Sequence, residues 1–509
     1  MYSAHPQVSA LIKLIDDKVC RNLFLKGLIG SGPALTIASL FSKKRGSYVC
    51  VLNDQEEAGY FYHDLMQLTD SPDVFFFPSA YRRAIKYGHL DPANEILRTE
   101  VLSRLQNPDL PTIIVTYPDA LAEKVIAQAD LRQKTLQISV GDKLDNMFVS
   151  DVLDEYGFEQ VDYVYEPGQY AMRGSILDVF SFSHEFPYRI DFFGSEVETI
   201  RTFEVESQLS KARLDHIAIV PEMNKSGLIS TSLLESLAPH TLLAFQDLEW
   251  CKERIGSIYG EDPITGDEEA FANAQQMRNR LVTDADFLRS VLDFRRISFG
   301  ARAAGVPDAT LTFCTRQQPI YHKNFDLVSS SFQSYLEEGY TLYILSDVEK
   351  QATRIRIIFE DRKEYIPFTS VNKTIHGGFA DETLKVCLFT DHQLFDRFHK
   401  FNLKSEKARS GKITLSLKEL NQFTTGDYIV HIDHGVGQFG GLVRTEVNGK
   451  LQEAIKLIYQ NNDIIFVSIH SLHKLAKYKG KESGEPPKLN KLGTGAWEKM
   501  KEKTKKKVK

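Results

Sequence analysis

The chain has few cysteines and no long apolar run. Its cysteines, Cys20, Cys50, Cys251, Cys314 and Cys387, lie far apart without a CxxC pair, which argues against both a zinc ribbon and a disulfide framework. No window approaches the length of a membrane span, and residues 1–18 carry acids where a signal peptide needs an apolar core. We therefore expect a cytoplasmic protein without membrane contact.

A strong excess of charge of either sign is also missing. The net charge is -6 over 509 residues, with 26% charged and 42% hydrophobic side chains. This balance gives no overall case for nucleic-acid binding, and the length requires several domains, of which we expect three to five. The exception is the lysine-rich segment 474–509, so a general nucleic-acid protein that binds through this segment is one alternative.

A glycine-rich turn follows the first predicted strand, within a strand–helix–strand unit over residues 21–52. It fits the phosphate-binding pattern GxxxxGK[ST] at Gly27 and Gly32, but Pro33 replaces the lysine and Ala34 replaces the hydroxyl. The lysine would neutralise phosphate and the hydroxyl would hold Mg²⁺, while proline also removes an N–H donor. We predict a degenerate P-loop-type α/β domain that binds no ATP. A plain α/β domain that never bound nucleotide would be equally inactive.

Two further features of this domain bear on function. The strand over residues 112–117 ends in Pro118-Asp119, where a motor would offer paired acids for metal and water. The segment 75–88 is aromatic and basic, which could suggest nucleic-acid contact through Tyr81, Arg82 and Arg83. Its aromatic run is more typical of a buried strand end, so we favour a structural role.

Residues 168–204 predict a β-meander that presents a partner-binding face. Alternation along 188–193 places Arg189, Asp191 and Phe193 on one side of the strand. Arginine beside an exposed aromatic ring is typical of a protein-binding hot spot. In the alternative interpretation, Phe193 packs under a loop and Arg189 pairs with Asp191 or Glu196.

The last predicted domain is a small antiparallel barrel that follows a charged linker. It contains two HxxH pairs, His431 with His434 and His470 with His473. We do not assign a metal to them, because the first pair spans a glycine turn and the second has no carboxylate nearby in sequence. The final helical stretch, 496–509, has no stop signal, so we expect the natural protein to continue.

Long motifs in this region resemble the RNA-polymerase-interacting module of the bacterial transcription-repair coupling factor (Mfd) family. They are GDYIVHIDHGVGQFGG, LIYQNNDIIFVSIHSLHKL and KLGTGAWEKMKEK. Upstream, GLIGSGPA, EPGQYAMRGSILDVF and PYRIDFFGSEVETIRTFEVESQ are similar to the family's amino-terminal region, which itself resembles the damage-binding protein UvrB. The resemblance covers the whole chain.

The resemblance implies two partners and their contact residues. The family binds UvrA through two arginines and a phenylalanine, which fall here on Arg173, Arg189 and Phe193. Its contact with the RNA polymerase β subunit lies on the strand EAIKLIY, which points to Ile455, Lys456 and Leu457. The first of these sets coincides with the face obtained from strand alternation.

The resemblance also implies a domain plan of multidomain α/β and α+β class. The order is a UvrB-like degenerate P-loop α/β domain in two parts (1–133 and 220–322), an inserted UvrA-binding β-rich adaptor domain (134–219), a small α/β domain (323–400), a linker (401–414), a CarD/Tudor-like β-barrel (415–492) and the start of a linker helix (493–509).

The implied function is that of an adaptor without catalytic residues or a cofactor of its own. It would link stalled RNA polymerase to UvrA for nucleotide excision repair. The family's ATP-dependent DNA translocase, which displaces stalled polymerase, would follow the barrel and supply the ATP, Mg²⁺ and main DNA contacts. A weaker DNA contact through the lysine-rich end is a further expectation. The alternative enzyme is a UvrB-like ATPase or helicase, which would need lysine at position 33.

Overall fold

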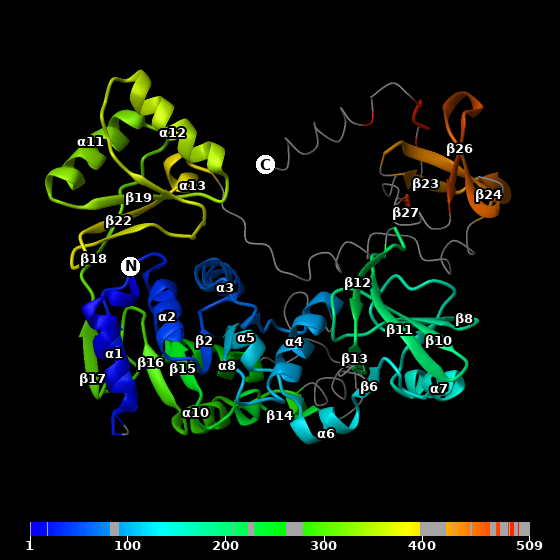
Figure 1. Cartoon of the computed structure of the whole chain (residues 1–509), viewed down its shortest axis with the longest axis horizontal. Coiled ribbons are helices and arrows are strands. Elements are labelled where there is room, and N and C mark those ends of the chain that lie inside the picture. The colour runs from blue at the N-terminus through cyan, green and yellow to red at the C-terminus, as the bar shows by residue number, and fades with distance from the viewer. Residues whose placement is uncertain are drawn as a thin grey trace. The chain divides into compact units, whose positions relative to one another are not determined.

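The fold is taken from a computed structural model of the whole chain (Figure 1). It describes residues 2–17, 19–81, 91–205, 207–221, 229–260, 278–397, 424–431, 433–447, 450–468, 475–478, 487, 489–492 and 497. The chain divides into two compact units, residues 1–136 with 219–406 and residues 137–218 with 407–509. The sheets of each unit are described below in turn.

The first unit begins with a parallel-sheet module, residues 2–136 and 219–313. Its strands, in the order in which they pair, are β17 (Ala309–Thr312), β1 (Asn22–Lys26), β16 (Arg295–Ser298), β15 (Leu242–Phe245), β2 (Ser47–Val51), β4 (Thr112–Thr116) and β3 (Val74–Phe76). Its main helices are α1 (Pro6–Asp16), α2 (Gly32–Lys43), α3 (Gln55–Thr69), α4 (Pro92–Arg104), α5 (Pro118–Leu121), α6 (Gln128–Gln133), α8 (Leu248–Gly260) and α10 (Asp284–Leu292). A short two-stranded sheet pairs β5 (Val125–Ile126) with β14 (Ile229–Thr231).

The central strands of this sheet are buried along their whole length. All five residues of β2 and of β4 are buried, as expected for parallel strands with helices on both faces. Some of the helices begin at side-chain caps: Asp54 accepts a hydrogen bond from the Glu57 N–H at α3, and Thr283 accepts one from the Asp286 N–H at α10. The strand–helix–strand unit predicted over residues 21–52 is therefore confirmed, and its glycine turn lies at the carboxyl end of β1.

The rest of the first unit is a small module, residues 314–397. Its sheet has the order β18 (Thr315–Gln317), β21 (Phe379–Asp381), β22 (Val386–Thr390), β19 (Thr341–Leu345) and β20 (Thr369–Val371). Its helices are α11 (Phe325–Glu337), α12 (Glu349–Asp361) and α13 (Asp391–Leu394), and Figure 1 shows α11 and α12 along one side of the sheet. Phe332 and Phe389 pack against each other in its core, with tilted rings whose centroids are 4.2 Å apart. Strands and helices together make this an α/β module.

An inserted module, residues 137–218, carries the predicted meander. Its sheet has the order β12 (Ser210–Leu214), β11 (Glu196–Phe203), β10 (Tyr188–Phe193), β9 (Ile176–Phe180), β8 (Gln169–Arg173) and β7 (Glu159–Gln160). The helix α7 (Asn146–Glu155) packs on it, because Asp154 accepts a hydrogen bond from the hydroxyl of buried Tyr170. A second pair of strands joins β6 (Leu136–Ser139) to β13 (His216–Ile219).

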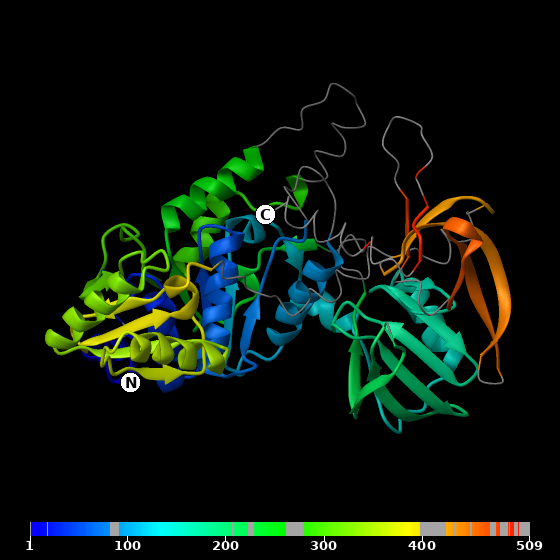
Figure 2. The same cartoon turned by 90° about the horizontal axis from the view of Figure 1, so that it is seen from above.

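The carboxyl-terminal sheet, residues 428–477, is antiparallel. Its order is β26 (Ile464–Ser468), β25 (Lys450–Ile458), β24 (Gly435–Val447), β23 (Tyr428–His431) and β27 (Leu475–Lys477). Figure 2 shows β24 and β25 as a long bent pair in orange. A closed barrel would require β26 to pair with β27, whereas in the described part of the chain these strands are the two edges of the sheet.

Several residues that the sequence suggested as contacts or linkers are buried or lie outside the described residues. Tyr81 is buried, so it does not offer its ring to nucleic acid. Arg82, Arg83, the linker 401–414 and nearly all of 493–509 lie outside the described residues. Within the described helices, none is both long and apolar enough to span a membrane.

Candidate functional site

A buried carboxylate organises the predicted face of the inserted module. Asp178 on β9 is fully buried and accepts two hydrogen bonds from Arg189 on β10, Nε to Oδ1 at 2.7 Å and Nη2 to Oδ2 at 2.8 Å. Arg173 on β8 donates to the same carboxylate from its other side. The bidentate contact with Asp178 raises the pKa of Arg189, so this guanidinium stays charged.

Both arginines are also held by aromatic rings. The Arg189 guanidinium lies 4.4 Å from the ring centroid of Phe203, and that of Arg173 lies 4.9 Å from the centroid of Tyr163. The Arg189 side chain keeps 16% of its surface exposed and Arg173 keeps 34%. The two cations are therefore fixed in direction, yet each still reaches solvent.

Phe193 lies at the end of the same strand and is open to solvent. Its exposed fraction is 80%, while its neighbour Phe192 is buried. A β-bulge between Asp191 and Phe192 interrupts the ladder with β11, and alternation of burial along β10 is nevertheless retained. A large apolar ring exposed on the same sheet face as two ordered arginines is the composition of a protein-binding hot spot.

The alternative ion pairs considered for this face are wrong. Arg189 bonds Asp178 instead of Asp191 or Glu196, and Asp191 bonds Arg201 and Thr199. Phe193 does not pack under a loop. Sequence reasoning missed Asp178 altogether; the one available signal was a charged residue inside the apolar strand ILDVF.

The carboxyl-terminal sheet corrects the predicted placement of the second contact. Ile455 and Leu457 on β25 are fully buried and form a core with Phe439, Tyr459 and others. Side chains with no exposed surface cannot touch a partner while the sheet is folded. Of the three residues that the resemblance singled out, Ile455 and Leu457 belong to the core.

The outward face of the same strands is apolar and accessible. Lys456 alternates with the two core residues and pairs across the sheet with Phe466 on the edge strand β26. Phe466 is 55% exposed and Ile464 is 45% exposed. An edge strand that exposes apolar side chains invites pairing with another protein, which most edge strands prevent with charges.

The histidine pairs behave as turn contacts where they are described. The His431 Nδ1 accepts a hydrogen bond from the Asp433 N–H, and its ring lies 4.5 Å from that of His434. Among the described residues no cluster of metal-binding side chains forms. His470 and His473 lie outside the described residues.

The glycine-rich turn has the backbone geometry of a tight loop before a helix. Gly27 and Gly30 have φ of 87° and 55°, values that residues with a side chain rarely adopt. The helix α2 begins at Gly32. Pro33 occupies the first turn of α2, and Ala34 is buried. The Asp119 carboxylate, which follows β4, is bound by Arg254 at 2.7 and 3.2 Å.

A buried acid on α3 lies beside this loop. Burial of Asp64 raises the pKa of its carboxyl to about 7, against the opposing effect of hydrogen bonds from Ser31 and the His376 N–H. Because the folded pKa lies above the ordinary value of 3.8, this group stabilises the fold most below about pH 4. That stability is lost as the pH rises through about 7.

We therefore expect Asp64→Asn to flatten part of the pH dependence. Between about pH 6 and pH 8 the wild-type free energy of unfolding should fall by about 1 kcal/mol relative to the variant. Denaturant titrations at several pH values measure this difference. Asp54→Asn, at the exposed cap of the same helix, should keep the wild-type slope. Parallel curves for wild type and Asp64→Asn would contradict the assignment. His63, His376 and His392, whose own pKa values are lowered by burial, are common to both proteins.

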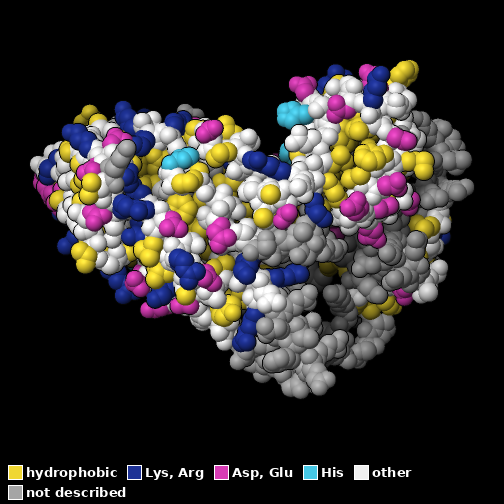
Figure 3. All heavy atoms as spheres, turned by 90° about the horizontal axis from the view of Figure 1, so that it is seen from below, with side chains coloured by type: hydrophobic (Ala, Val, Ile, Leu, Met, Phe, Trp, Pro, Cys, Tyr) yellow, Lys and Arg dark blue, Asp and Glu magenta, His cyan; other side chains and the backbone are white. Residues whose placement is uncertain are grey.

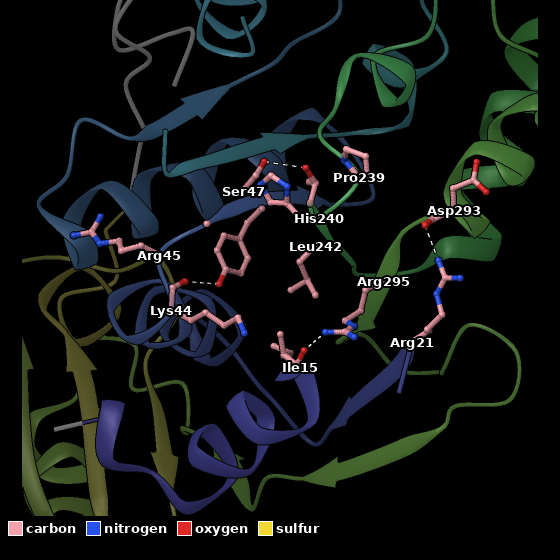
Figure 4. A pocket seen from close by; sticks show the side chains of 13 residues that line it. Ile15, Arg21, Lys44, Arg45, Ser47, Pro239, His240, Leu242, Asp293 and Arg295 are labelled. Carbon is pink, nitrogen blue, oxygen red and sulfur yellow. Dashed lines mark hydrogen bonds between the residues drawn. The ribbon is translucent and has the colours of Figure 1, made fainter. Parts of the chain in front are cut away.

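A basic pocket of about 400 Å³ lies at the opposite, amino-terminal edge of the parallel sheet (Figure 4). Its cations already have partners. Arg21 donates to the Asp293 carbonyl at the end of α10, and Arg295 donates to the Asp17 carbonyl at the end of α1, at 2.6 and 2.8 Å. Lys44 pairs with Asp16. Cations at helix carboxyl ends are explained by capping, so we assign no ligand to this pocket.

Comparison with known protein families identifies two domains in the chain. The family model of the UvrB interaction domain matches residues 136–224, which contain the inserted module. The family model of the CarD-like/TRCF RID domain matches residues 423–479, which contain the carboxyl-terminal sheet. Each of the two faces described above thus lies inside a recognised domain.

Whole-chain similarity extends to curated relatives named transcription-repair-coupling factor. The one from Bacillus subtilis (strain 168) is 22% identical over 558 residues, covering 94% of this chain and 47% of the relative. Those from Staphylococcus epidermidis (strain ATCC 12228 / FDA PCI 1200) and Staphylococcus aureus (strain USA300) are 24% and 23% identical and cover 96% of this chain. The chain spans about half the length of the curated relatives it matches.

Proposed function

We propose that this chain, which is similar along 94–96% of its length to transcription-repair-coupling factors and contains a UvrB interaction domain and a CarD-like/TRCF RID domain, is the adaptor half of such a factor. It recruits UvrA through the inserted module and holds the RNA polymerase β subunit through the carboxyl-terminal sheet. Its own mechanism is binding, and the coupling results from carrying both faces on one chain.

The observation that carries this proposal is the exposed ring of Phe193 on the same sheet face as two arginines fixed on Asp178. Arginines held in place lose little conformational freedom when a partner binds, so more of the contact energy appears as affinity. The ring supplies apolar surface that loses its contact with water when the partner binds. The three residues Arg173, Arg189 and Phe193 act as a recognition unit, and Asp178 positions the two arginines.

Phe193→Ala should weaken UvrA binding by about 2 kcal/mol, roughly 30-fold in Kd, because the exposed ring would be buried by the partner. The melting temperature should not change, since the ring has 80% of its surface in solvent. Titration of UvrA against immobilised chain measures the affinity. Phe148→Ala removes a half-exposed ring from α7 in the same module and should bind as wild type does. Equal affinities for Phe193→Ala and wild type would remove Phe193 from the site.

For polymerase, we propose the outward face made by Lys456, Ile464 and Phe466. Here one cation and two exposed apolar side chains lie on β25 and the edge strand β26. Burial of an apolar face together with a strand edge is a common way to bind an extended segment of a partner. Ile455 and Leu457 support this face from beneath.

We further propose that the chain acts without ATP or a metal and works in the cytoplasm. Pro33 and Ala34 leave the glycine loop without the lysine and hydroxyl that nucleotide chemistry needs, and Asp119 is engaged by Arg254. Mg-ATP titrated into the chain should give no micromolar binding by calorimetry. Such binding would favour the alternative, a UvrB-like ATPase or helicase.

General nucleic-acid binding is less well supported. On the face shown in Figure 3, Lys and Arg side chains are interspersed with Asp and Glu over the described residues. A phosphate-binding surface instead gathers Lys and Arg without interspersed acids, and its affinity for nucleic acid falls steeply as the salt concentration rises. The lysine-rich end is the remaining candidate for a weak DNA contact.

A further inference from the structure

The glycine loop is occupied by the backbone of the small module. The Ser31 N–H donates to the Gly377 carbonyl oxygen at 2.8 Å, and the Gly377 N–H donates to Ser31 Oγ at 2.9 Å. Ser31 immediately precedes α2, so the Gly377 oxygen lies at the positive end of that helix. This is where a phosphate-binding loop would place a phosphate oxygen.

The two segments approach so closely that an added side chain would be crowded on either of them. A Cβ on Gly30 would lie 2.6 Å from the Gly377 oxygen, and one on Gly377 would lie 3.0 Å from the Gly30 Cα. A Cβ on Gly378 would lie 2.2 Å from the Leu388 carbonyl oxygen of β22. A Cβ contact below 3 Å forces the structure to shift, which excludes a side chain at Gly30 and at Gly378, while a Cβ on Gly377 would require its neighbour to give by a few tenths of an ångström.

Residues 374–378, named here the clasp loop, are anchored on both sides of the contact. On the side of the small module, the Gly378 N–H donates to Gln393 Oε1 at 2.9 Å. On the side of the parallel sheet, the His376 N–H donates to buried Asp64 at 2.7 Å, and the His376 ring stacks on Tyr60 with centroids 3.7 Å apart. The clasp loop is thus tied to α3 as well as to the glycine loop.

Apolar packing continues across the same boundary. Ile375, Phe379, Leu345 and Leu388 of the small module belong to the main core of the parallel-sheet module. Phe379 is fully buried, and its ring meets that of Tyr2 edge-on at 6.2 Å. A buried apolar seam of this kind resists separation and fixes the clasp loop at the carboxyl edge of β1.

We propose that the small module is the resident occupant of the degenerate phosphate loop, and that its clasp loop locks the first unit in one arrangement by filling the place of a nucleotide phosphate. The Gly377 carbonyl supplies the acceptor that the loop N–H groups would otherwise take from phosphate. In this arrangement the first unit needs no nucleotide to order its loop. This assigns a role to a module for which the sequence indicated none.

The lock is tested by hydrogen exchange on the full chain. Gly377→Val places a branched side chain against Gly30 and Ser31, so amides in peptides covering residues 27–35 and 374–380 should exchange at least tenfold faster together. Ser370→Val adds the same side chain at an exposed position of β20 and should leave both peptides at wild-type rates. Unchanged exchange at 27–35 in Gly377→Val would overturn the proposal.

A milder variant keeps the test decisive if Gly377→Val loses its fold. Ser31→Ala removes only the hydroxyl that accepts the Gly377 N–H and should accelerate exchange in the same two peptides severalfold. Acceleration confined to one of them would show that the segments are not locked together and would overturn the proposal.

Whether the clasp loop fills the phosphate position is tested by restoring the lysine and the hydroxyl that a phosphate-binding loop uses. Pro33→Lys with Ala34→Thr is compared with the same pair of changes plus Gly377→Val, using a fluorescent ATP analogue with Mg²⁺. If the clasp loop fills the phosphate position, the triple variant should bind at least tenfold more tightly. Equal binding by the two proteins would contradict the occupancy.

Discussion

Asp178→Ala should destabilise the inserted module by about 3 kcal/mol, the lower end of the range for breaking a buried ion pair. The carboxylate has no exposed surface and is the shared anionic partner of two guanidinium groups, Arg173 and Arg189. Without it, Arg189 would keep its charge against the ring of Phe203 and beneath the loop at Gln208, with no anion to match it. UvrA binding should be lost as well, although no contact residue has been changed.

Asp191→Ala is the matched control, since it removes the same group from the same sheet. Its partner Arg201 is 31% exposed, and the pair lies near solvent. The cost should stay below about 1 kcal/mol. Two measurements on the full chain separate Asp178→Ala from Asp191→Ala: chemical denaturation, and hydrogen exchange in peptides covering 169–203. Similar small losses for both variants would show that Asp178 is not the organising group.

Ile455→Arg should unfold the carboxyl-terminal sheet. A guanidinium placed among Phe439, Leu457 and Val467 has no partner there, and an unpaired buried charge costs several kcal/mol. A small sheet has little stability to lose. Peptides covering residues 450–468 should therefore lose protection from hydrogen exchange, while β2 and β4 keep theirs. Polymerase binding disappears as a consequence of unfolding.

Lys456→Glu tests the neighbouring position, whose side chain points outward. It should preserve exchange protection throughout the sheet and reduce polymerase binding by reversing a charge on the proposed face. Unchanged polymerase binding by Lys456→Glu would instead favour Ile455, the contact predicted from the sequence. If Ile455→Arg keeps full protection and loses only polymerase, Ile455 is a direct contact.

Local patterns in the sequence were sufficient for most elements and for one face. Alternation along YRIDFF placed Arg189 and Phe193 on the outer side of β10, and the structure confirms that side. The same rule applied to EAIKLIY separates Lys456 from Ile455 and Leu457, and the apolar pair is the one that should turn inward. The resemblance points to a strand, and burial decides which of its side chains a partner can reach.

Contacts between distant segments were beyond such patterns. Asp178 and Arg189 are eleven residues apart and meet only because β9 and β10 pair in one register. Ser31 and Gly377 are separated by 346 residues, and no local propensity connects them. The missing lysine and hydroxyl of the glycine loop could be read from Pro33 and Ala34. That another part of the chain fills the loop could not.

The central claim is that one chain binds two partners through two independent faces. The most direct measurement is the affinity of separate UvrA and RNA polymerase β fragments for the wild-type chain, Phe193→Ala and Phe466→Ala, in one biolayer-interferometry series. We predict that Phe193→Ala loses UvrA and keeps polymerase, and that Phe466→Ala loses polymerase and keeps UvrA. Wild-type affinity for both partners in both variants, or loss of both partners in either variant, would contradict the account.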